Sequence, residues 1–208
     1  MIRRLARLLL IVLATVGVAT SVTAVWFVSQ GISARSAPGR LETAVARRLR
    51  AAAIPRTART LNSPVPASPE SSSEGLEHFA DHCAVCHAND GSGDTEMGRG
   101  LYPRPPDLRR PATQSLTDGE LFYIIENGVR LTGMPAWGDG TSAGERASWH
   151  LVQFVRRLPS LTPEDIARMQ ELNPKSPREF REEEEARKFL AGESPAPKPA
   201  PAHKHGGR

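Results

Sequence analysis

The chain opens with a long apolar segment. Leu8 to Val28 form 21 consecutive residues without a charge, and three arginines precede them. At 1.5 Å per residue this run is about 30 Å long as a helix, which matches the hydrocarbon thickness of a bilayer. Residues 1–30 are therefore predicted to form a single-pass membrane anchor.

A cleaved signal peptide is the alternative for this segment, because Val22-Thr23-Ala24 resembles a small-residue cleavage site. The apolar run is longer than the usual signal-peptide core of roughly 7–15 residues, and it continues beyond that site to Val28. We favour the uncleaved anchor. Five arginines soon after the run outnumber the three before it, so charge alone leaves the orientation undecided.

The next segment, residues 31–73, is basic. Leu41, Val45 and Leu49 stand four residues apart with arginines between them, the pattern of a short amphipathic helix that can lie on an anionic membrane surface. A solvated basic helix in a stalk fits the same pattern. Residues 62–73 are rich in proline and serine and are predicted to form a flexible linker.

Helical periodicity dominates residues 74–160, where no strand-like alternation is present. Three capping-box patterns each precede apolar residues at helical spacing. They are Ser71 with Glu74, Thr117 with Glu120, and Ser142 with Glu145. The segment is predicted to be an all-α domain with three main helices.

Two helix starts follow this domain. Thr162 and Ser176 each precede a proline, which is favourable at the first helical position. They predict a short helical extension over residues 161–192. Residues 193–208 are rich in proline and alanine and are predicted to be a disordered tail, in which His203 and His205 supply too few ligands for a complete metal site.

The net charge of +4 belongs to the N-terminal part of the chain. Residues 1–60 carry ten arginines against one acid, whereas residues 74–160 carry twelve acids and eight arginines. A nucleic-acid-binding domain would concentrate basic residues on the folded part. We therefore expect no nucleic-acid partner.

The most specific chemistry lies in Cys83-Ala84-Val85-Cys86-His87. The chain has two cysteines in all, which argues against a disulfide framework. C-x-x-C-H is the pattern of covalent haem attachment, in which the two thiols bond to the haem and the adjacent histidine ligates its iron. A redox dithiol is expected near a βαβ pattern, and a structural zinc site needs further ligands. Haem c is the favoured interpretation.

A second iron ligand is predicted at Met134. This residue stands in the turn Gly133-Met134-Pro135-Ala136-Trp137, 47 residues after His87. A lone methionine is more often core filler, but glycine and proline restrict the backbone here. The other candidates for the sixth position are Met97, His78, His82 and His150.

With these two motifs, residues 74–160 resemble the monohaem class I cytochrome c family of bacteria. The resemblance implies three main helices around one covalent haem per chain, with Gly75 and Phe79 packed against Phe154 where the first and last helices cross. It also implies that the carbonyl of Pro106, in the P-x-L segment that ends at Leu108, accepts the second N–H of the haem histidine.

The sequence departs from the family at two places. Ala88 follows the haem histidine where glycine is common, and His82 precedes the first cysteine where asparagine is common. Neither change removes a ligand. Trp137 is the better candidate N–H donor for the haem propionates; Arg99 and Arg104 are also candidates, with a solvated surface position as the equal alternative for both.

With His87 and Met134 as axial ligands the iron would have no open position, so electron transfer is favoured over catalysis. We expect a membrane-bound electron carrier of a respiratory-type chain, with its haem domain on the periplasmic side of the inner membrane. The expected partners are redox proteins such as a membrane dehydrogenase or oxidase. A haem-based gas-sensing module and a non-catalytic haem subunit of a larger oxidoreductase complex remain as alternatives, and the oligomeric state stays open.

Overall fold

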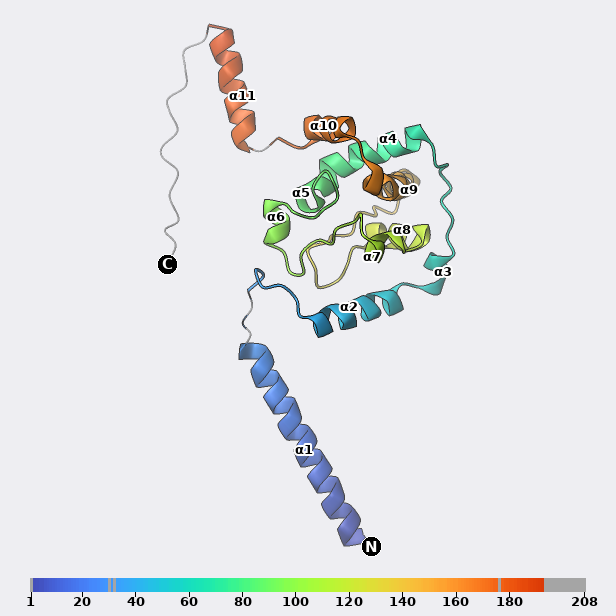
Figure 1. Cartoon of the computed structure of the whole chain (residues 1–208), viewed down its shortest axis with the longest axis vertical. Helices are drawn as coiled ribbons and strands as arrows, with labels where there is room; N and C mark the ends of the chain where they lie inside the picture. The colour runs from blue at the N-terminus through green and yellow to red at the C-terminus, as the bar shows by residue number, and fades with distance from the viewer. Residues whose placement is uncertain (1, 30, 32, 176, 193–208) are drawn as a thin grey trace.

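The computed structural model describes residues 2–29, 31, 33–175 and 177–192, and these residues form helices and loops without any strand. The all-α prediction is therefore confirmed for this part of the chain. The predicted disordered tail, with His203 and His205, lies outside the described residues. Figure 1 shows the order of the helices, whose bounds are as follows.

The N-terminal helices are α1 Ile2–Ser29, α2 Arg40–Ala53 and α3 Arg56–Arg59. The central part contains α4 Pro69–His78, the π-helix η1 Phe79–Cys83, α5 Ala84–His87, α6 Glu96–Arg99, α7 Pro111–Gln114 and α8 Asp118–Asn127. The C-terminal part contains α9 Ser142–Arg157, the 3₁₀ helix η2 Leu158–Ser160, α10 Pro163–Leu172 and α11 Pro177–Leu190.

Helix α1 stands apart from the rest of the molecule. Its segment Arg3–Ser29 is long and apolar enough to cross a membrane, and none of its most apolar window is buried inside the protein. The C-terminal end of α1 lies near the packed helices while its N-terminus points away from them (Figure 1). An exposed apolar helix of this length fits the predicted anchor.

The core of the packed region is the crossing of α4 and α9. Gly75 lies so close to α9 that a Cβ atom there would be 2.7 Å from the backbone carbon of His150 and 2.8 Å from Cβ of Phe154. One turn further on, the rings of Phe79 and Phe154 lie 5.1 Å apart, and both side chains are fully buried. This contact confirms the crossing that the family resemblance implied.

Helix α8 covers one side of this crossing. The rings of Phe122 and Trp149 stack at 4.2 Å, which joins α8 to α9. Thr117 caps α8: its hydroxyl accepts from the backbone N–H of Glu120, whose carboxylate accepts from the N–H of Thr117. This capping box was predicted correctly because it depends only on neighbouring residues.

Two other predicted caps were wrong, one by three residues and one by a single residue. Helix α4 begins earlier than expected, with Ser68 as its cap and Pro69 at the first helical position, so Ser71 is buried inside the helix. Residues 69–73 are thus helical and not part of a flexible linker. The cap of α9 is Thr141, whose hydroxyl accepts from the N–H of Gly144, and Ser142 is the first helical residue.

Packing extends beyond residues 74–160 at both ends. Before them, Ile54 and Ala58 are buried, and Ala58 lies against Gly119 of α8. After them, Met169 of α10 is completely buried in the main core. Arg157 donates to both carboxylate oxygens of Asp165 at 2.7 and 2.6 Å, which fastens α10 to the end of α9.

Candidate functional site

A local change of helical pitch presents the C-x-x-C-H residues. The α-helix α4 passes into one π-helical turn at Phe79–Cys83, and the short helix α5 then carries the chain from Ala84 to His87. Single π turns in helices are frequent at functional sites because they change the direction of the following side chains. Here the π turn begins at the fully buried Phe79 and ends at Cys83.

The backbone turns sharply after His87. Ala88 has φ 61° and ψ 156°, a conformation that is essentially restricted to glycine. Its N–H still donates to the carbonyl of Ala84 at 2.8 Å, and the N–H of Gly93 donates to the carbonyl of His87 at 2.8 Å. The preference for glycine after the haem histidine, from which this sequence departs, is thus explained by the backbone at this position.

The two thiols are unpaired and protonated. Cys83 and Cys86 are free, not joined as a disulfide. Burial raises the pKa of the Cys83 thiol to about 12, with the neighbouring Cys86 adding to the shift, and burial also raises the pKa of Cys86. A redox-active dithiol has the opposite property, a pKa below the ordinary value of a thiol. This environment argues against the dithiol interpretation.

A zinc site is also not supported. Within the residues that the structure describes, no three His, Cys, Asp or Glu side chains converge so that they could hold a metal ion. A structural zinc site requires four such ligands in a tetrahedral arrangement.

The His87 ring is neutral, and its Nδ1 atom lacks a hydrogen bond of normal geometry. Burial lowers its pKa to about 4, and the nearby backbone carbonyl of Pro106 opposes this shift. That carbonyl does not complete a hydrogen bond of normal geometry, since the buried Nδ1 atom has no partner among the described residues. A neutral imidazole is the form that ligates iron. The predicted bond from His87 to Pro106 stays a prediction, although the two groups are neighbours.

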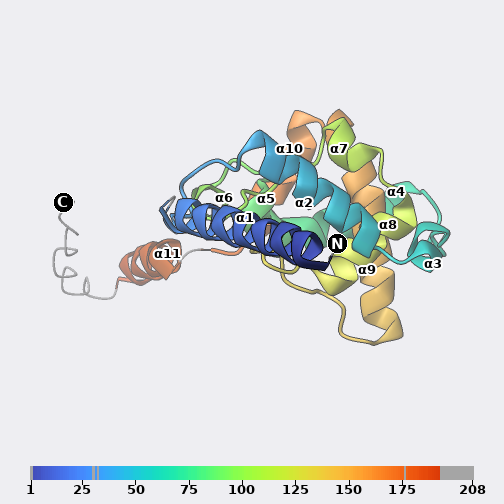
Figure 2. The same cartoon turned by 90° about the horizontal axis from the view of Figure 1, so that it is seen from below.

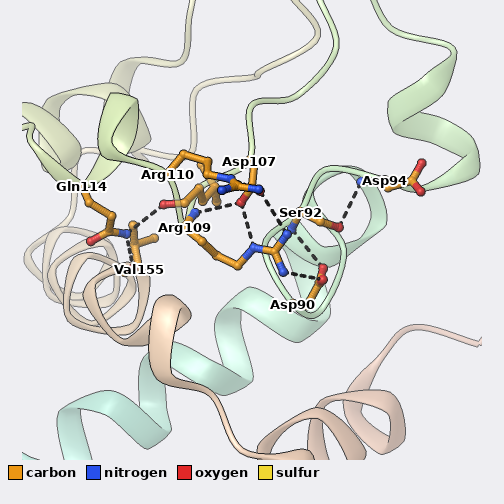
Figure 3. Close-up of polar contacts among 9 residues, drawn as sticks. Asp90, Ser92, Asp94, Asp107, Arg109, Arg110, Gln114 and Val155 are labelled. Carbon is orange, nitrogen blue, oxygen red and sulfur yellow. Dashed lines mark hydrogen bonds and ion pairs between the residues drawn. The ribbon is translucent and has the colours of Figure 1, made fainter.

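A network of ion pairs fixes the loop that carries Pro106 (Figure 3). Arg109 donates from Nε and Nη2 to the two oxygens of Asp107, at 2.8 and 3.0 Å, and from Nη1 to Asp90 at 2.9 Å. Asp90 lies three residues after His87, and Asp107 directly follows Pro106. These hydrogen bonds lower the pKa of Asp107 to about 2, which keeps it ionised.

Backbone and amide contacts extend this loop into the core. The N–H of Leu108 donates to the carbonyl of Gly91 at 2.8 Å. The side-chain amide of Gln114 donates to the carbonyls of Leu108 and Val155, at 2.8 and 2.9 Å, and so ties the loop to α9 (Figure 3). Leu108 itself packs against the main core. The Pro106–Leu108 segment is therefore held beside the histidine by contacts from three parts of the chain.

The Met134 turn is held against the end of α8. The carbonyl of Met134 accepts from the N–H of Val129 at 3.1 Å, and the N–H of Met134 donates to the hydroxyl of Thr132 at 3.1 Å. Gly133 lies against Leu101, in the loop that follows α6. Met134 is half-buried. The turn is thus fixed from two sides, as a ligand-bearing loop requires.

Trp137 lies at the edge of the motif and not in the core. Its side chain is 36% exposed, and its ring lies 5.1 Å from that of His82, the residue before Cys83. Its backbone N–H donates to the carbonyl of Ile125 at 3.1 Å. Arg99 is engaged by Asp94 at 2.6 Å on the surface. A propionate role for Trp137, Arg99 and Arg104 stays a prediction.

Comparison with known proteins agrees with this geometry. Residues 70–155 match the family described as cytochrome C oxidase, cbb3-type, subunit III. This domain is a c-type cytochrome domain. No curated protein matches the chain. The fold of three main helices around the C-x-x-C-H motif is the cytochrome c fold, and such a domain indicates an electron carrier or a subunit of an oxidoreductase.

The residues present fit a covalently held haem c. Two unoxidised thiols precede a neutral histidine whose buried Nδ1 lacks a hydrogen-bond partner. After α8 in the chain, the turn that contains Met134 is held by backbone hydrogen bonds. Cys83 and Cys86 would form the thioether bonds. His87 would ligate the iron on one side. This donor set is a nitrogen with a thioether, which suits haem iron.

Sequence analysis missed the residues that hold these groups. Arg109, Asp90 and Gln114 each connect segments that are distant in the chain, and Arg156 joins α9 to α8 by donating to Asp118 at 2.8 Å. The aspartate and arginine that surround the P-x-L segment were visible as charges. No local pattern indicated which partner each would find.

Proposed function

We propose that this protein is a membrane-anchored monohaem cytochrome c that passes single electrons between redox partners, with His87 and Met134 as the axial iron ligands. The C-x-x-C-H residues carry this proposal, because two free thiols directly precede a buried, neutral His87 imidazole that lies beside the carbonyl of Pro106. The bound haem would supply a one-electron couple of iron. The anchor would hold the domain at the inner membrane, on its periplasmic side.

In this proposal the protein residues act by positioning. Cys83 and Cys86 would hold the ring covalently, and Pro106 would orient the histidine through its carbonyl. The ion pairs of Arg109 keep Pro106 in place. Met134 would supply the second protein ligand and so exclude small molecules, and Leu108 and Trp137 would lie beside the ring. Little rearrangement is needed between oxidation states because each of these loops is tied to a helix.

A second candidate is a non-catalytic haem subunit of a larger membrane oxidoreductase. It is favoured by the matching family, which is described as a subunit of a cbb3-type oxidase. The redox partner would then be a permanent neighbour in the membrane. Co-purification of stoichiometric partner subunits in mild detergent distinguishes this candidate from a free carrier.

The test is the optical spectrum of the haem-loaded full chain in detergent, together with its intact mass. We expect the mass of one covalent haem and, in the oxidised protein, the far-red band of a sulfur–iron bond. Met134→Ala should abolish that band and lower the midpoint potential, because thioether ligation raises it. Met97→Ala is the matched control, since Met97 is 54% exposed in helix α6, and it should leave both unchanged.

A chain without covalent haem would overturn the whole proposal. A haem-loaded chain in which Met134→Ala keeps the far-red band would overturn the ligand assignment alone. Carbon monoxide binding to the reduced wild-type protein without denaturation would contradict a closed sixth position and favour a gas-sensing role.

A further inference from the structure

Helix α2 carries an apolar stripe that nothing in the described protein covers. Leu41, Val45 and Leu49 are 78%, 47% and 65% exposed. They are spaced by four residues, so they lie along one face of the helix. Three large apolar side chains in a row on an exposed helix face indicate contact with a partner or with lipid.

The stripe points away from the cytochrome domain. Thr43 and Arg50 are the half-buried positions of α2, and at about 100° per residue their face is roughly 150° from that of the stripe. The residue that ends the helix, Ile54, is 3% exposed against the domain. The domain therefore occupies the back of α2 and leaves the apolar face outward.

Polar contacts hold α2 in this orientation. The hydroxyl of Tyr102 donates to Glu42 at 2.5 Å, and the guanidinium of Arg59 donates to the carbonyl of Ala51. Arg59 also pairs with Glu120 of α8 at 3.3 Å. The helix is thus attached near both of its ends, and its stripe keeps a fixed direction relative to the domain.

The stripe lies on the side of the candidate membrane helix. Helix α2 runs crosswise between the C-terminal end of α1 and the packed domain (Figure 1), and both helices lie in front of the domain in the view from below (Figure 2). Ten residues separate Ser29 from Arg40, a length of chain that spans at most about 35 Å. A membrane that contains α1 is within reach of α2.

The positive charge of α2 favours an anionic surface. Arg40, Arg47 and Arg48 have no carboxylate partner within the part of the chain that the structure describes, and the one acid of the helix, Glu42, is engaged by Tyr102. Arg48 stands seven residues after Leu41, on the border of the stripe, where its long side chain can reach phosphate oxygens of lipid headgroups.

We infer that α2 binds the anionic lipid surface of the membrane that α1 enters, with Leu41, Val45 and Leu49 inserted at the boundary of headgroups and acyl chains. The cytochrome domain then presents one constant face to the membrane and moves laterally with it. The inference rests on the membrane anchor of the proposed function, but it does not depend on which residues ligate the iron.

The test measures the depth of α2 in a bilayer. Val45→Cys in the haem-loaded full chain supplies one reactive thiol, because haem attachment consumes Cys83 and Cys86. An environment-sensitive fluorophore on that thiol is followed in vesicles whose lipids carry a quencher near the headgroup, with or without phosphatidylglycerol in phosphatidylcholine. Ala51→Cys is the matched control, since position 51 is exposed on the same helix about a third of a turn away.

We expect the label at position 45 to lose about half of its emission to the lipid quencher in the anionic vesicles, since interfacial helices insert about 5–10 Å. The label at position 51 should lose much less. Vesicles without phosphatidylglycerol, or Arg48→Gln in the Val45→Cys background, should weaken the quenching severalfold, whereas Arg146→Gln on α9 should not.

Equal and weak quenching at both positions would overturn the inference. So would protection of position 45 from an aqueous quencher without lipid quenching, because that result indicates a second copy of the chain or a protein partner. Equal quenching with and without phosphatidylglycerol would overturn the assignment to anionic lipid. If haem attachment failed, the mass would show extra labels on Cys83 and Cys86, which separates failure of the proposed function from failure of this inference.

Discussion

The closest approach of α4 and α9 makes a single methyl group a severe perturbation. In Gly75→Ala the new Cβ atom would lie 2.7 Å from the backbone carbon of His150 and 2.8 Å from Cβ of Phe154, and closer still to the carbonyl oxygen of His150. Non-bonded carbon atoms prefer about 3.5–4.0 Å. The two helices would have to separate by about 1 Å, because the obstacles are backbone atoms and a Cβ that cannot rotate away.

The cost of this separation is set by what the two helices bury between them. Phe79 and Phe154 are fully buried at the crossing, and a gap of about 0.5–1 Å forfeits a quarter to a half of each van der Waals contact. Overpacking of cores usually costs about 1–3 kcal/mol, and this site belongs at the upper end or above it. Alanine in a helix regains about 1 kcal/mol relative to glycine. We expect a net loss of about 2–3 kcal/mol in the free energy of unfolding.

The assay is guanidinium unfolding of the haem-loaded full chain in detergent, followed by helical circular dichroism and haem absorbance together. Gly100→Ala is the control: Gly100 has φ −88°, and an added Cβ would meet only an ordinary 3.4 Å contact. It should change the stability by less than about 0.5 kcal/mol. The packing argument is refuted if Gly75→Ala also stays within about 0.5 kcal/mol of the wild type.

Three further predictions concern pH, backbone strain and the packing of helix α10. The pKa of Asp107 is about 2 in the folded protein and about 4 when unfolded, so its ion pairs contribute about 2 kcal/mol to stability. This contribution is present above pH 4 and is lost as the pH falls toward 2, which can be measured as the free energy of unfolding against pH. Ala88→Gly should stabilise the protein by about 1 kcal/mol, measured by guanidinium unfolding, because the backbone there has φ 61°. Met169→Ala should cost about 2–5 kcal/mol in the same assay, since Met169 is completely buried.

Each of these predictions has its own control. Asp107→Asn should flatten the acid slope, and an unchanged slope would show that other carboxylates cause it. Ala167→Gly places glycine in an ordinary exposed position of α10 and should destabilise by about 1 kcal/mol, opposite in sign to Ala88→Gly. Met97→Ala removes an exposed methionine and should cost less than about 0.5 kcal/mol of unfolding free energy. If Met169→Ala cost as little as Met97→Ala, burial of α10 in the core would be contradicted.

The features that could be predicted from the sequence are those decided within a few residues. The cap of α8 needs only Thr117 and Glu120, and it forms as predicted. Helix α10 begins directly after Thr162, as the proline at position 163 predicted. The start of α4 was missed although its signal was present. Ser68 followed by Pro69 is a stronger helix start than Ser71, because proline is favoured at the first helical position and its missing N–H needs no partner.

The polar contacts between distant segments could not be predicted, for a different reason. Arg109 and Asp90 are 19 residues apart, and Gln114 and Val155 are 41 apart. A charge or amide in a loop has many partners within reach of an unfolded chain, and only the packed helices decide among them. The C-x-x-C-H motif is local and could be recognised in the sequence. The residues that position it find their partners only in the completed fold.

Periodicity has a similar limit, and two helices of this protein show it. Both α2 and α9 carry apolar residues at intervals of three or four positions. In α9 this face, with Leu151, Phe154 and Val155 buried, is covered, and Phe154 lies against Gly75 of α4. In α2 the corresponding face, with Leu41 and Leu49, is exposed although the helix is bound to the domain by its other side. The pattern of a sequence therefore identifies an apolar face but not what covers it. Only the direction of that face in the folded chain, toward the end of α1, singles out the membrane surface for α2.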